Sequence, residues 1–292
     1  MKNAMVALVM TYALTWWSPA VLADEPQPTD QHDAQAAFRK QLEALDWIRG
    51  PKKVQLFDNS NLQVPEGYLF LNPPDTAKLQ ALQHNLAGAT QYFLAPEDFR
   101  WQVLFSFSSD GYVKDDEKID ANALLKSIED STVEGNKVRR EKGWDEMEVV
   151  GWQTAPHYDS QTHRLEWAID GKNVRTNNVV VNFNTRLLGR GGVMSAVLIT
   201  APDALAPSIS EFKGTLNGFE YVPGQRYAEY KPGDKIAKYG LAALVTGGAA
   251  AIAVKTGLWK VIVTAVAAGW KFIAAAAVAL FGGISRRFKR KA

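Results

Sequence analysis

The sequence predicts an α+β fold, with one antiparallel sheet, helices packed on one face of that sheet, and a C-terminal transmembrane helix. Four strand-like segments follow each other closely between residues 147 and 200, and short connections favour antiparallel pairing. Helical patterns lie before and after this run, which is typical of α+β folds. The third observation is a long apolar stretch near the C-terminus, which ends in a basic cluster.

The first 23 residues have the pattern of a secretory signal peptide. Lys2 provides a positive start, residues 4–17 are apolar and uncharged, and small residues up to Ala23 precede the acidic Asp24. The apolar run is shorter than the roughly 20 residues of a membrane span, so an uncleaved N-terminal anchor is the weaker alternative. We therefore expect cleavage after Ala23 and export of the mature chain.

Residues 24–234 are expected to form the exported α+β domain, and its first half alternates helices and strands. We expect an amphipathic helix over residues 38–47, strands at 54–56 and 68–71, and a helix capped by Asp75 that runs to about residue 87. Residues 101–107 alternate, which predicts a strand with the apolar residues Trp101, Val103, Phe105 and Phe107 on one face.

The second half of the domain is expected to be a meander of strands between two helices. The first helix covers residues 119–130 and its pattern extends towards 142, and the second covers 203–217. The strands are expected at residues 147–154, 163–169, 178–185 and 193–200. Turns are expected at Asp170-Gly171 and at residues 189–192, where the glycines would supply positive φ angles. The last strand is apolar on both faces, which places it in the centre of the sheet.

Residues 235–284 are expected to anchor the chain in the membrane. Residues 261–284 are long enough to cross a bilayer once. The basic tail, residues 285–292, is expected to stay in the cytoplasm because positive residues beside a span do so. A hairpin of two spans is the alternative. Lys260 and Lys271 interrupt the apolar stretch on one helix face, and we expect this face to contact a membrane partner.

The charge distribution separates an acidic domain from a cationic tail. Residues 24–234 hold all 31 acidic residues and 22 of the 33 basic ones, a net charge of −9, although the whole chain carries +2. An acidic domain argues against nucleic acid as a partner. The chain has no cysteine, which excludes disulfides and thiolate metal sites.

Few residues are candidates for chemistry, and the strongest group lies at an expected hairpin turn. His157, Asp159 and His163 are weak candidates for a metal site, because zinc accepts imidazole and carboxylate ligands. Polar residues of this kind are also common in turns that bind nothing. The acidic run 115–120 is expected to be a helix start, the basic run 136–142 a solvated helix face, and Trp144, Trp152 and Trp167 part of the core.

Five segments of the chain resemble the bacterial membrane-anchored proteins grouped as domain of unknown function 2167. They are residues 111–117 (GYVKDDE), 136–139 (NKVR), 151–159 (GW, then Pro156, then YD), 184–193 (NTRLLGRGGV) and 233–241 (GDKIAKYGL). Each segment alone is unspecific, but the combination is specific and spans most of residues 30–260. The resemblance implies a Gram-negative envelope protein with no established activity and no catalytic residue to carry over.

The functional expectation is therefore a non-enzymatic module that binds or scaffolds another membrane or periplasmic protein. We expect a single-pass protein of a bacterial inner membrane, with its domain in the periplasm and without a cofactor. An anchored periplasmic hydrolase or metal-dependent enzyme is one alternative, and it depends on the histidine group. A small-ligand sensor is the other alternative.

Overall fold

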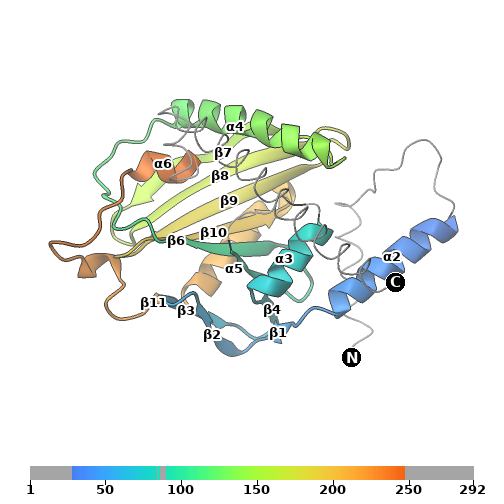
Figure 1. Ribbon diagram of the computed structural model, residues 1–292, viewed down its shortest axis with the longest axis horizontal. Coiled ribbons are helices and arrows are strands. Elements are labelled where there is room, and N and C mark those ends of the chain that lie inside the picture. The colour runs from blue at the N-terminus through green and yellow to red at the C-terminus, as the bar shows by residue number, and fades with distance from the viewer. Residues whose placement is uncertain (1–27, 84, 86–89, 247–292) are drawn as a thin grey trace, which may run out of the picture. The chain divides into compact units, whose positions relative to one another are not determined.

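The computed structural model describes residues 28–246, except residue 84 and residues 86–89 (Figure 1). The chain divides into two compact units, the first reaching Val245 and the second running from Thr246 to Ala292. The folded unit thus continues beyond the boundary expected at residue 234. The predicted signal peptide, the predicted span 261–284, Lys260, Lys271 and the basic tail lie outside the described residues. None of the helices within the described ranges combines the length and apolarity of a membrane span.

Eight strands form one antiparallel sheet in the order β1-β4-β5-β6-β10-β9-β8-β7. They are β1 (Ile48–Arg49), β4 (Tyr68–Leu71), β5 (Tyr92–Pro96), β6 (Gln102–Ser108), β7 (Met147–Asp159), β8 (Arg164–Asn173), β9 (Val179–Leu188) and β10 (Val193–Thr200). The expected antiparallel α+β class is confirmed. The apolar strand β10 pairs with β6 on one side and with β9 on the other, so its predicted central place is confirmed.

Three further strands form a small second sheet, of which the sequence indicated only the strand at residues 54–56. They are β2 (Lys52–Leu56), β3 (Ser60–Val64) and β11 (Phe219–Tyr221), in the order β11-β3-β2. The strand β3 alternates buried and exposed residues, with Leu62 and Val64 inaccessible to solvent. The last strand arrives from a distant part of the sequence, which explains why local patterns did not reveal this sheet.

Five α-helices lie in the described part of the chain. They are α2 (Pro28–Glu43), α3 (Pro73–Leu82), α4 (Ala121–Glu141), α5 (Leu205–Leu216) and α6 (Leu241–Thr246), with short 3-10 turns η1 (Pro202–Ala204) and η2 (Tyr227–Glu229). Asp120 caps α4 by accepting hydrogen bonds from the backbone N–H groups of Asn122 and Ala123, each 3.1 Å long. The cap expected from Asp75 is wrong: α3 begins earlier, at two prolines, with Asn72 as its N-cap.

One side of the large sheet, which we call the core face, packs against α5 and the three-stranded sheet. Phe105 and Phe183 of the large sheet, Phe212 of α5 and Leu62 of β3 belong to this apolar cluster. Trp101, Val103 and Phe107 belong to it as well, which confirms the predicted alternation along β6. This face contains the main hydrophobic core.

Helices cover the opposite face too, so the prediction of helices on one face only is wrong. Leu79 of α3 packs with Leu104 of β6, and Leu124 of α4 clusters with Trp167 of β8. Figure 1 shows α4 beside strands β7 and β8. The physical reason is that the inner strands carry large apolar side chains on both faces, and each face needs its own cover.

The opposite face differs from the core face along the strand β9. Val181, Phe183 and Leu187 point to the core face, so the alternating Asn182, Asn184 and Arg186 point to the opposite one. Ser195 of β10 lies directly across from Arg186. We call this part of the sheet, formed by Asn182, Asn184, Arg186 and Ser195, the polar face.

Two turns differ from the expectation. Asp170 and Gly171 lie inside β8 and pair with β9, so the turn predicted there is wrong, and the chain reverses at residues 174–178 instead. The turn at residues 189–192 is confirmed, but its glycines do not have positive φ angles. A Cβ at Gly192 would overlap the carbonyl oxygen of Ser108, so close backbone approach explains the glycine.

Candidate functional site

Three loops meet at one end of the large sheet, and we call this region the loop end. It comprises residues 109–117, residues 189–192 and residues 222–239. Tyr112 donates its N–H to the carbonyl of Lys235, and Ala237 donates to the carbonyl of Tyr112, each at 2.8 Å. Arg190 donates its backbone N–H to the carbonyl of Gln225 at 2.9 Å. Backbone hydrogen bonds therefore join segments that are far apart in the sequence.

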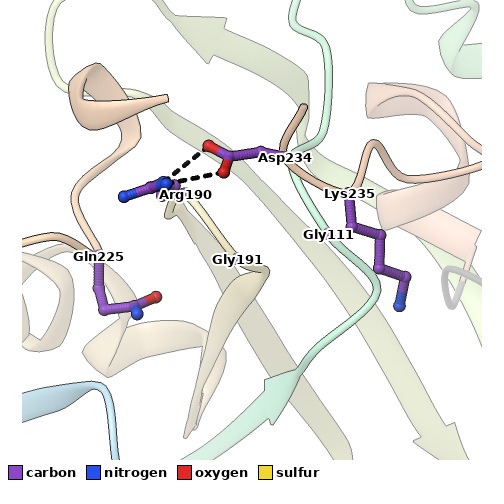
Figure 2. A pocket seen from close by; sticks show the side chains of 6 residues that line it. All are labelled: Gly111, Arg190, Gly191, Gln225, Asp234 and Lys235. Atoms are coloured by element: carbon purple, nitrogen blue, oxygen red, sulfur yellow. Dashed lines mark hydrogen bonds and ion pairs between the residues drawn. The ribbon is translucent and has the colours of Figure 1, made fainter. Parts of the chain in front are cut away.

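A bidentate ion pair between Arg190 and Asp234 holds the loop end together (Figure 2). Both guanidinium-to-carboxylate hydrogen bonds are 2.7 Å long, which is the strong fork geometry. Asp234 also accepts the backbone N–H of Lys231 at 2.7 Å. The hydrogen bonds from Arg190, followed by that from Lys231, lower the pKa of Asp234 to about 2. Asp234 is therefore a structural carboxylate that stays ionised at neutral pH.

A polar hollow of about 280 Å³ opens beside this ion pair (Figure 2). It is lined by Gly111, Arg190, Gly191, Gln225, Asp234 and Lys235. Lys235 donates from its ammonium group to the carbonyl of Ser109 at 3.0 Å. Ligand pockets usually have volumes of about 300–1,000 Å³, so this hollow suits only a small group. Its lining supplies charge and hydrogen bonds rather than a nucleophile with an adjacent base.

An aromatic cluster lies next to the hollow. Tyr112 stacks on Tyr227 and contacts Tyr230, with ring centroids 4.4 Å apart in both pairs. Tyr158 donates its hydroxyl hydrogen to Asp115 at 2.8 Å, and its oxygen lies 3.1 Å from Nδ1 of His163. Burial, together with the hydrogen bond to Asp115, raises the pKa of Tyr158 above its ordinary value. The cluster is partly exposed and carries both apolar rings and a carboxylate.

The three residues considered as metal ligands are not brought together. His163 lies in the aromatic cluster, 4.4 Å from the Tyr227 ring. Nε2 of His157 lies 3.8 Å from Glu166, which is on the same side of β8 as the core residue Ala168. Asp159 accepts hydrogen bonds from the N–H of Gln161 and the hydroxyl of Thr162, both at 2.8 Å. In the searched ranges, no three His, Asp or Glu side chains are placed to hold a metal ion.

The charged runs of the sequence have structural partners. In the acidic run, Asp120 caps α4 and Glu117 accepts the backbone N–H of Ala242 at 2.9 Å. In the basic run, Asn136 is buried and bonds the backbone of Met147 in both directions, and Arg140 pairs with Glu146 at 2.6 Å. The expectation of a helix start at the acidic run is confirmed, and the basic run is partly buried rather than wholly solvated.

The three tryptophans expected in the core differ in burial. Trp167 is 2% exposed, so its predicted core position is confirmed. Trp152 is partly buried against the α4 cluster and donates its indole N–H to the carbonyl of Ala121 at 3.1 Å. Trp144 is also only partly buried, with the cations of Lys142 and Arg139 within 5.1 and 5.8 Å of its ring.

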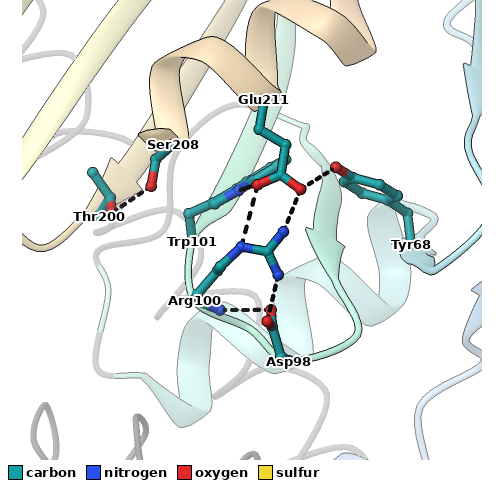
Figure 3. Close-up of polar contacts among 7 residues, drawn as sticks. All are labelled: Tyr68, Asp98, Arg100, Trp101, Thr200, Ser208 and Glu211. Atoms are coloured by element: carbon teal, nitrogen blue, oxygen red, sulfur yellow. Dashed lines mark hydrogen bonds and ion pairs between the residues drawn. The ribbon is translucent and has the colours of Figure 1, made fainter. Parts of the chain in front are cut away.

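A second polar network, which the sequence did not reveal, joins α5 to the edge of the core face (Figure 3). Glu211 accepts hydrogen bonds from the Tyr68 hydroxyl at 2.8 Å and the Trp101 indole at 2.9 Å. Arg100 donates to Glu211 through two of its nitrogens and also pairs with Asp98. Each charged group in this network has a partner, so its role is to hold α5 in place.

Arg186 is the other charged residue that the sequence analysis missed. Its side chain lies over the Trp167 ring, with the guanidinium carbon 4.6 Å from the ring centroid. The alternation of Asn182, Asn184 and Arg186 is visible in the sequence, but the strand was predicted to end at residue 185 and no polar face was predicted from it. Polar residues at every second position of such a strand indicate a polar face inside the fold.

The fold and the loop end define an α+β protein that carries a polar hollow and an aromatic cluster at one end of a mixed-polarity sheet. The chain belongs to the family described as Protein of unknown function (DUF2167), whose model matches residues 48–281. This match confirms the resemblance stated from the sequence motifs.

Other comparisons add little about activity. The solution structure of the cyanobacterial PsbP protein, CyanoP, from Synechocystis sp. PCC 6803 is similar with a TM-score of 0.35 and 12% identity, over 58% of this chain and 91% of that one. A likeness at this level says nothing about what the chain binds. A comparison with curated protein sequences found no match.

Proposed function

We propose that the chain is an exported, membrane-anchored envelope protein whose folded unit is a binding or scaffolding module placed close to the membrane surface. The observation that carries this proposal is the way the folded unit holds the segment just before residue 247. Ala237, Leu241, Leu244 and Val245 are buried in one apolar cluster with Val193 of the sheet. The folded unit thus holds the start of the predicted anchoring region without a loose linker.

Polar contacts strengthen this attachment. Tyr239 donates its hydroxyl hydrogen to Asp110 at 2.6 Å, and the N–H of Ala242 donates to Glu117 at 2.9 Å. A Cβ on Gly240 would overlap the Glu117 carboxylate, so the glycine permits this close approach. A module held this way keeps the loop end near the point where residues 247–292 begin. The acidic domain and the basic tail favour an orientation with the domain in the periplasm and the tail in the cytoplasm.

Fractionation of a Gram-negative host that expresses the chain tests the topology. We expect the full chain in the inner membrane with a mature N-terminus at Asp24, and a chain ending at Thr246 in the soluble periplasmic fraction. The matched control is Leu8→Arg, which places a charge in the apolar core of the signal and should keep the chain unprocessed. Recovery of the full chain in the soluble fraction would contradict the anchor, and an unprocessed wild-type N-terminus would contradict the signal peptide.

Cross-linking in the native membrane tests the scaffolding role. A photo-reactive residue at Lys271 or Lys260 is expected to capture a defined membrane protein, because a lysine at bilayer depth is costly without a polar partner. The same probe at the neighbouring Phe272 serves as the control for position. If the probe cross-links only to other copies of this chain, and the chain purifies alone in mild detergent, the scaffolding role is contradicted.

A small-ligand sensor is the second candidate, and the polar hollow favours it. The hollow lies at the loop end, whose segments continue into the helix α6 before residue 247. A ligand bound there would contact residues 225, 234 and 235, just ahead of the predicted anchoring region. Thermal unfolding that shifts with a small polar ligand, and that loses the shift in Gln225→Ala, would support this candidate.

A further inference from the structure

The guanidinium of Arg186 is largely buried and has no anionic partner among the described residues. Its Nη1 atom is inaccessible to solvent and makes no hydrogen bond to this part of the chain. Burial lowers the pKa of Arg186 to about 10, and no carboxylate contributes to that pKa. The Asp110 carboxylate is occupied by hydrogen bonds from Ser108 and Tyr239. An unpaired buried charge is strongly destabilising unless another group supplies the missing interaction.

The contact with Trp167 gives the guanidinium a cation–π interaction but provides no acceptor for its N–H groups. The guanidinium carbon lies 4.6 Å from the centroid of the indole ring, which is a cation–π distance. The five N–H donors of arginine lie in the guanidinium plane, so a ring above that plane leaves them without acceptors. The ring also limits where the guanidinium can lie, and the planar fork of arginine is suited to bidentate recognition of an oxyanion.

Two hydroxyl groups lie beside Arg186 on the same face of the sheet. Ser195 of β10 pairs with Arg186 across the ladder, and Ser106 of β6 pairs with Ser195. Side chains that face each other in this way have Cβ atoms about 4.5–5.5 Å apart. The side chains of Ser106 and Ser195 form no hydrogen bond within the part of the chain that the structure describes. A row of one guanidinium and two hydroxyls therefore crosses three adjacent strands.

We propose that Arg186, with Ser195 and Ser106 beside it, binds an oxyanion, a carboxylate or a phosphate group, on the polar face of the sheet. The guanidinium donates two parallel hydrogen bonds to the anion and the hydroxyls donate further ones. The bound anion supplies the negative charge that the polypeptide around Arg186 does not. This inference goes beyond the anchored topology, since each of the named groups belongs to the folded unit, and it stands whether or not the chain is exported.

Thermal unfolding of the full-length chain in an uncharged detergent tests the proposal. The melting temperature is measured in sodium chloride, sodium phosphate and sodium acetate at equal ionic strength. One of the two oxyanions is expected to raise the melting temperature above its value in chloride. The rise should level off with anion concentration, at about 5 °C. The anion that saturates at the lower concentration identifies the class. A melting temperature that depends only on ionic strength overturns the proposal.

Three variants locate the site. Arg186→Met removes the charge but keeps much of the apolar bulk, and it should abolish the oxyanion-dependent rise. Arg186→Lys retains a charge without the planar fork and should require roughly tenfold more anion. Arg164→Met, on the neighbouring strand with its side chain towards the core face, is the matched control and should respond like the wild type.

The variants can also overturn the proposal. An undiminished rise in Arg186→Met shows that the anion binds elsewhere. If Arg186→Met does not fold, Arg186→Lys decides, and an unchanged anion concentration dependence in that variant overturns the proposal. A rise lost equally in Arg164→Met shows non-specific charge screening and overturns it as well.

Discussion

Glu211 and Arg186 are two charged residues in the same folded unit, and their surroundings are opposite. Glu211, on the helix that covers the core face, receives hydrogen bonds from Tyr68, Trp101 and Arg100. Arg186, on the polar face, has a ring beside it but a buried nitrogen that finds no acceptor within residues 28–246, where the structure is described. The first arrangement is complete without any other molecule. The second is incomplete, and this difference separates a stabilising network from a candidate binding site.

The two faces of the sheet show the same contrast between a stabilising region and a candidate binding region. On the core face, Phe105, Phe183 and Phe212 share one apolar cluster, as expected for a face whose role is stability. On the polar face, the strand β9 presents amide and guanidinium groups at a central position of an eight-stranded sheet. Polar groups at such positions cost stability unless they have partners, which supports the binding role proposed for Arg186.

The largest expected effect is on the core face. Phe212→Ala removes a side chain with no solvent exposure and should lower the free energy of unfolding by about 3–5 kcal/mol. Chemical denaturation followed by circular dichroism measures this loss. Val133→Ala, at a residue that is 59% exposed on α4, is the control and should change stability by less than about 0.5 kcal/mol. Similar losses in both variants would contradict the assignment of the core.

Glu211→Gln should lower the free energy of unfolding by less than Phe212→Ala does, about 1–2 kcal/mol at pH 7. The charged hydrogen bonds weaken, while the shape of the side chain remains. Burial raises the pKa of Glu211, but hydrogen bonds from Trp101, Tyr68 and Arg100 outweigh it, so the folded pKa lies below the ordinary value. The stabilisation is therefore present above about pH 4.3, the unfolded value, and is lost as the pH falls through the folded pKa.

The pH dependence of unfolding separates this network from an ordinary surface pair. Below about pH 4.3, the wild type should lose stability more steeply than Glu211→Gln does, as the pH falls through the folded pKa of Glu211. Glu97→Gln, which removes the exposed pair with Arg49, is the control and should leave the wild-type slope almost unchanged. Equal slopes in wild type and Glu211→Gln would remove the case for a stabilising network.

A local effect is expected at the loop end. Asp234→Asn breaks the bidentate pair with Arg190, so amide hydrogens in residues 222–235 should exchange faster while the rest of the sheet stays protected. The wild type should show the same local loosening only as the pH falls towards 2, because the lowered pKa keeps Asp234 ionised above that value. Asp75→Asn, at a helix-surface pair with Lys78, is the matched control. Unchanged exchange in Asp234→Asn would show that the backbone contacts alone hold the loops.

The smallest effect on stability is expected on the polar face. Ser195→Val replaces a partly buried hydroxyl with a β-branched apolar side chain on a central strand, and stability should change by no more than about 0.5 kcal/mol. Denaturant titration without added oxyanion measures it. A loss above about 1.5 kcal/mol would mean that the polar face belongs to the stability core, and the contrast between the two faces would fail.

Much of the fold followed from local periodicity. The alternation of residues 101–107 located β6, the apolar run 193–200 located the central strand β10, and Asp120 marked the start of α4. Of the small second sheet only the strand at residues 54–56 was predicted, because β3 and β11 are short and β11 joins β3 from more than 150 residues away. The turn expected at Asp170-Gly171 was wrong because β8 continues through these residues while paired with β9.

The candidate sites were predicted from the sequence less well than the fold was, for a physical reason. Arg190 and Asp234 lie in separate loops, and Arg100 and Glu211 lie 111 residues apart. No pattern of neighbouring residues marks either pair, since both form only when distant backbone segments meet. His157 and His163 show the opposite case, because they are close in sequence but have different surroundings.

The sequence by itself determined the charge asymmetry, the apolar ends, the α+β class and the alternation that puts Asn182, Asn184 and Arg186 on one side of a strand. These features depend on composition and on periods of a few residues. Only the tertiary structure decided that Glu211 is surrounded by donors and that Arg186 lies over Trp167, with no carboxylate of the described residues paired to it. Whether a charge is satisfied depends on which distant residues fold against it, and a linear pattern does not contain that information.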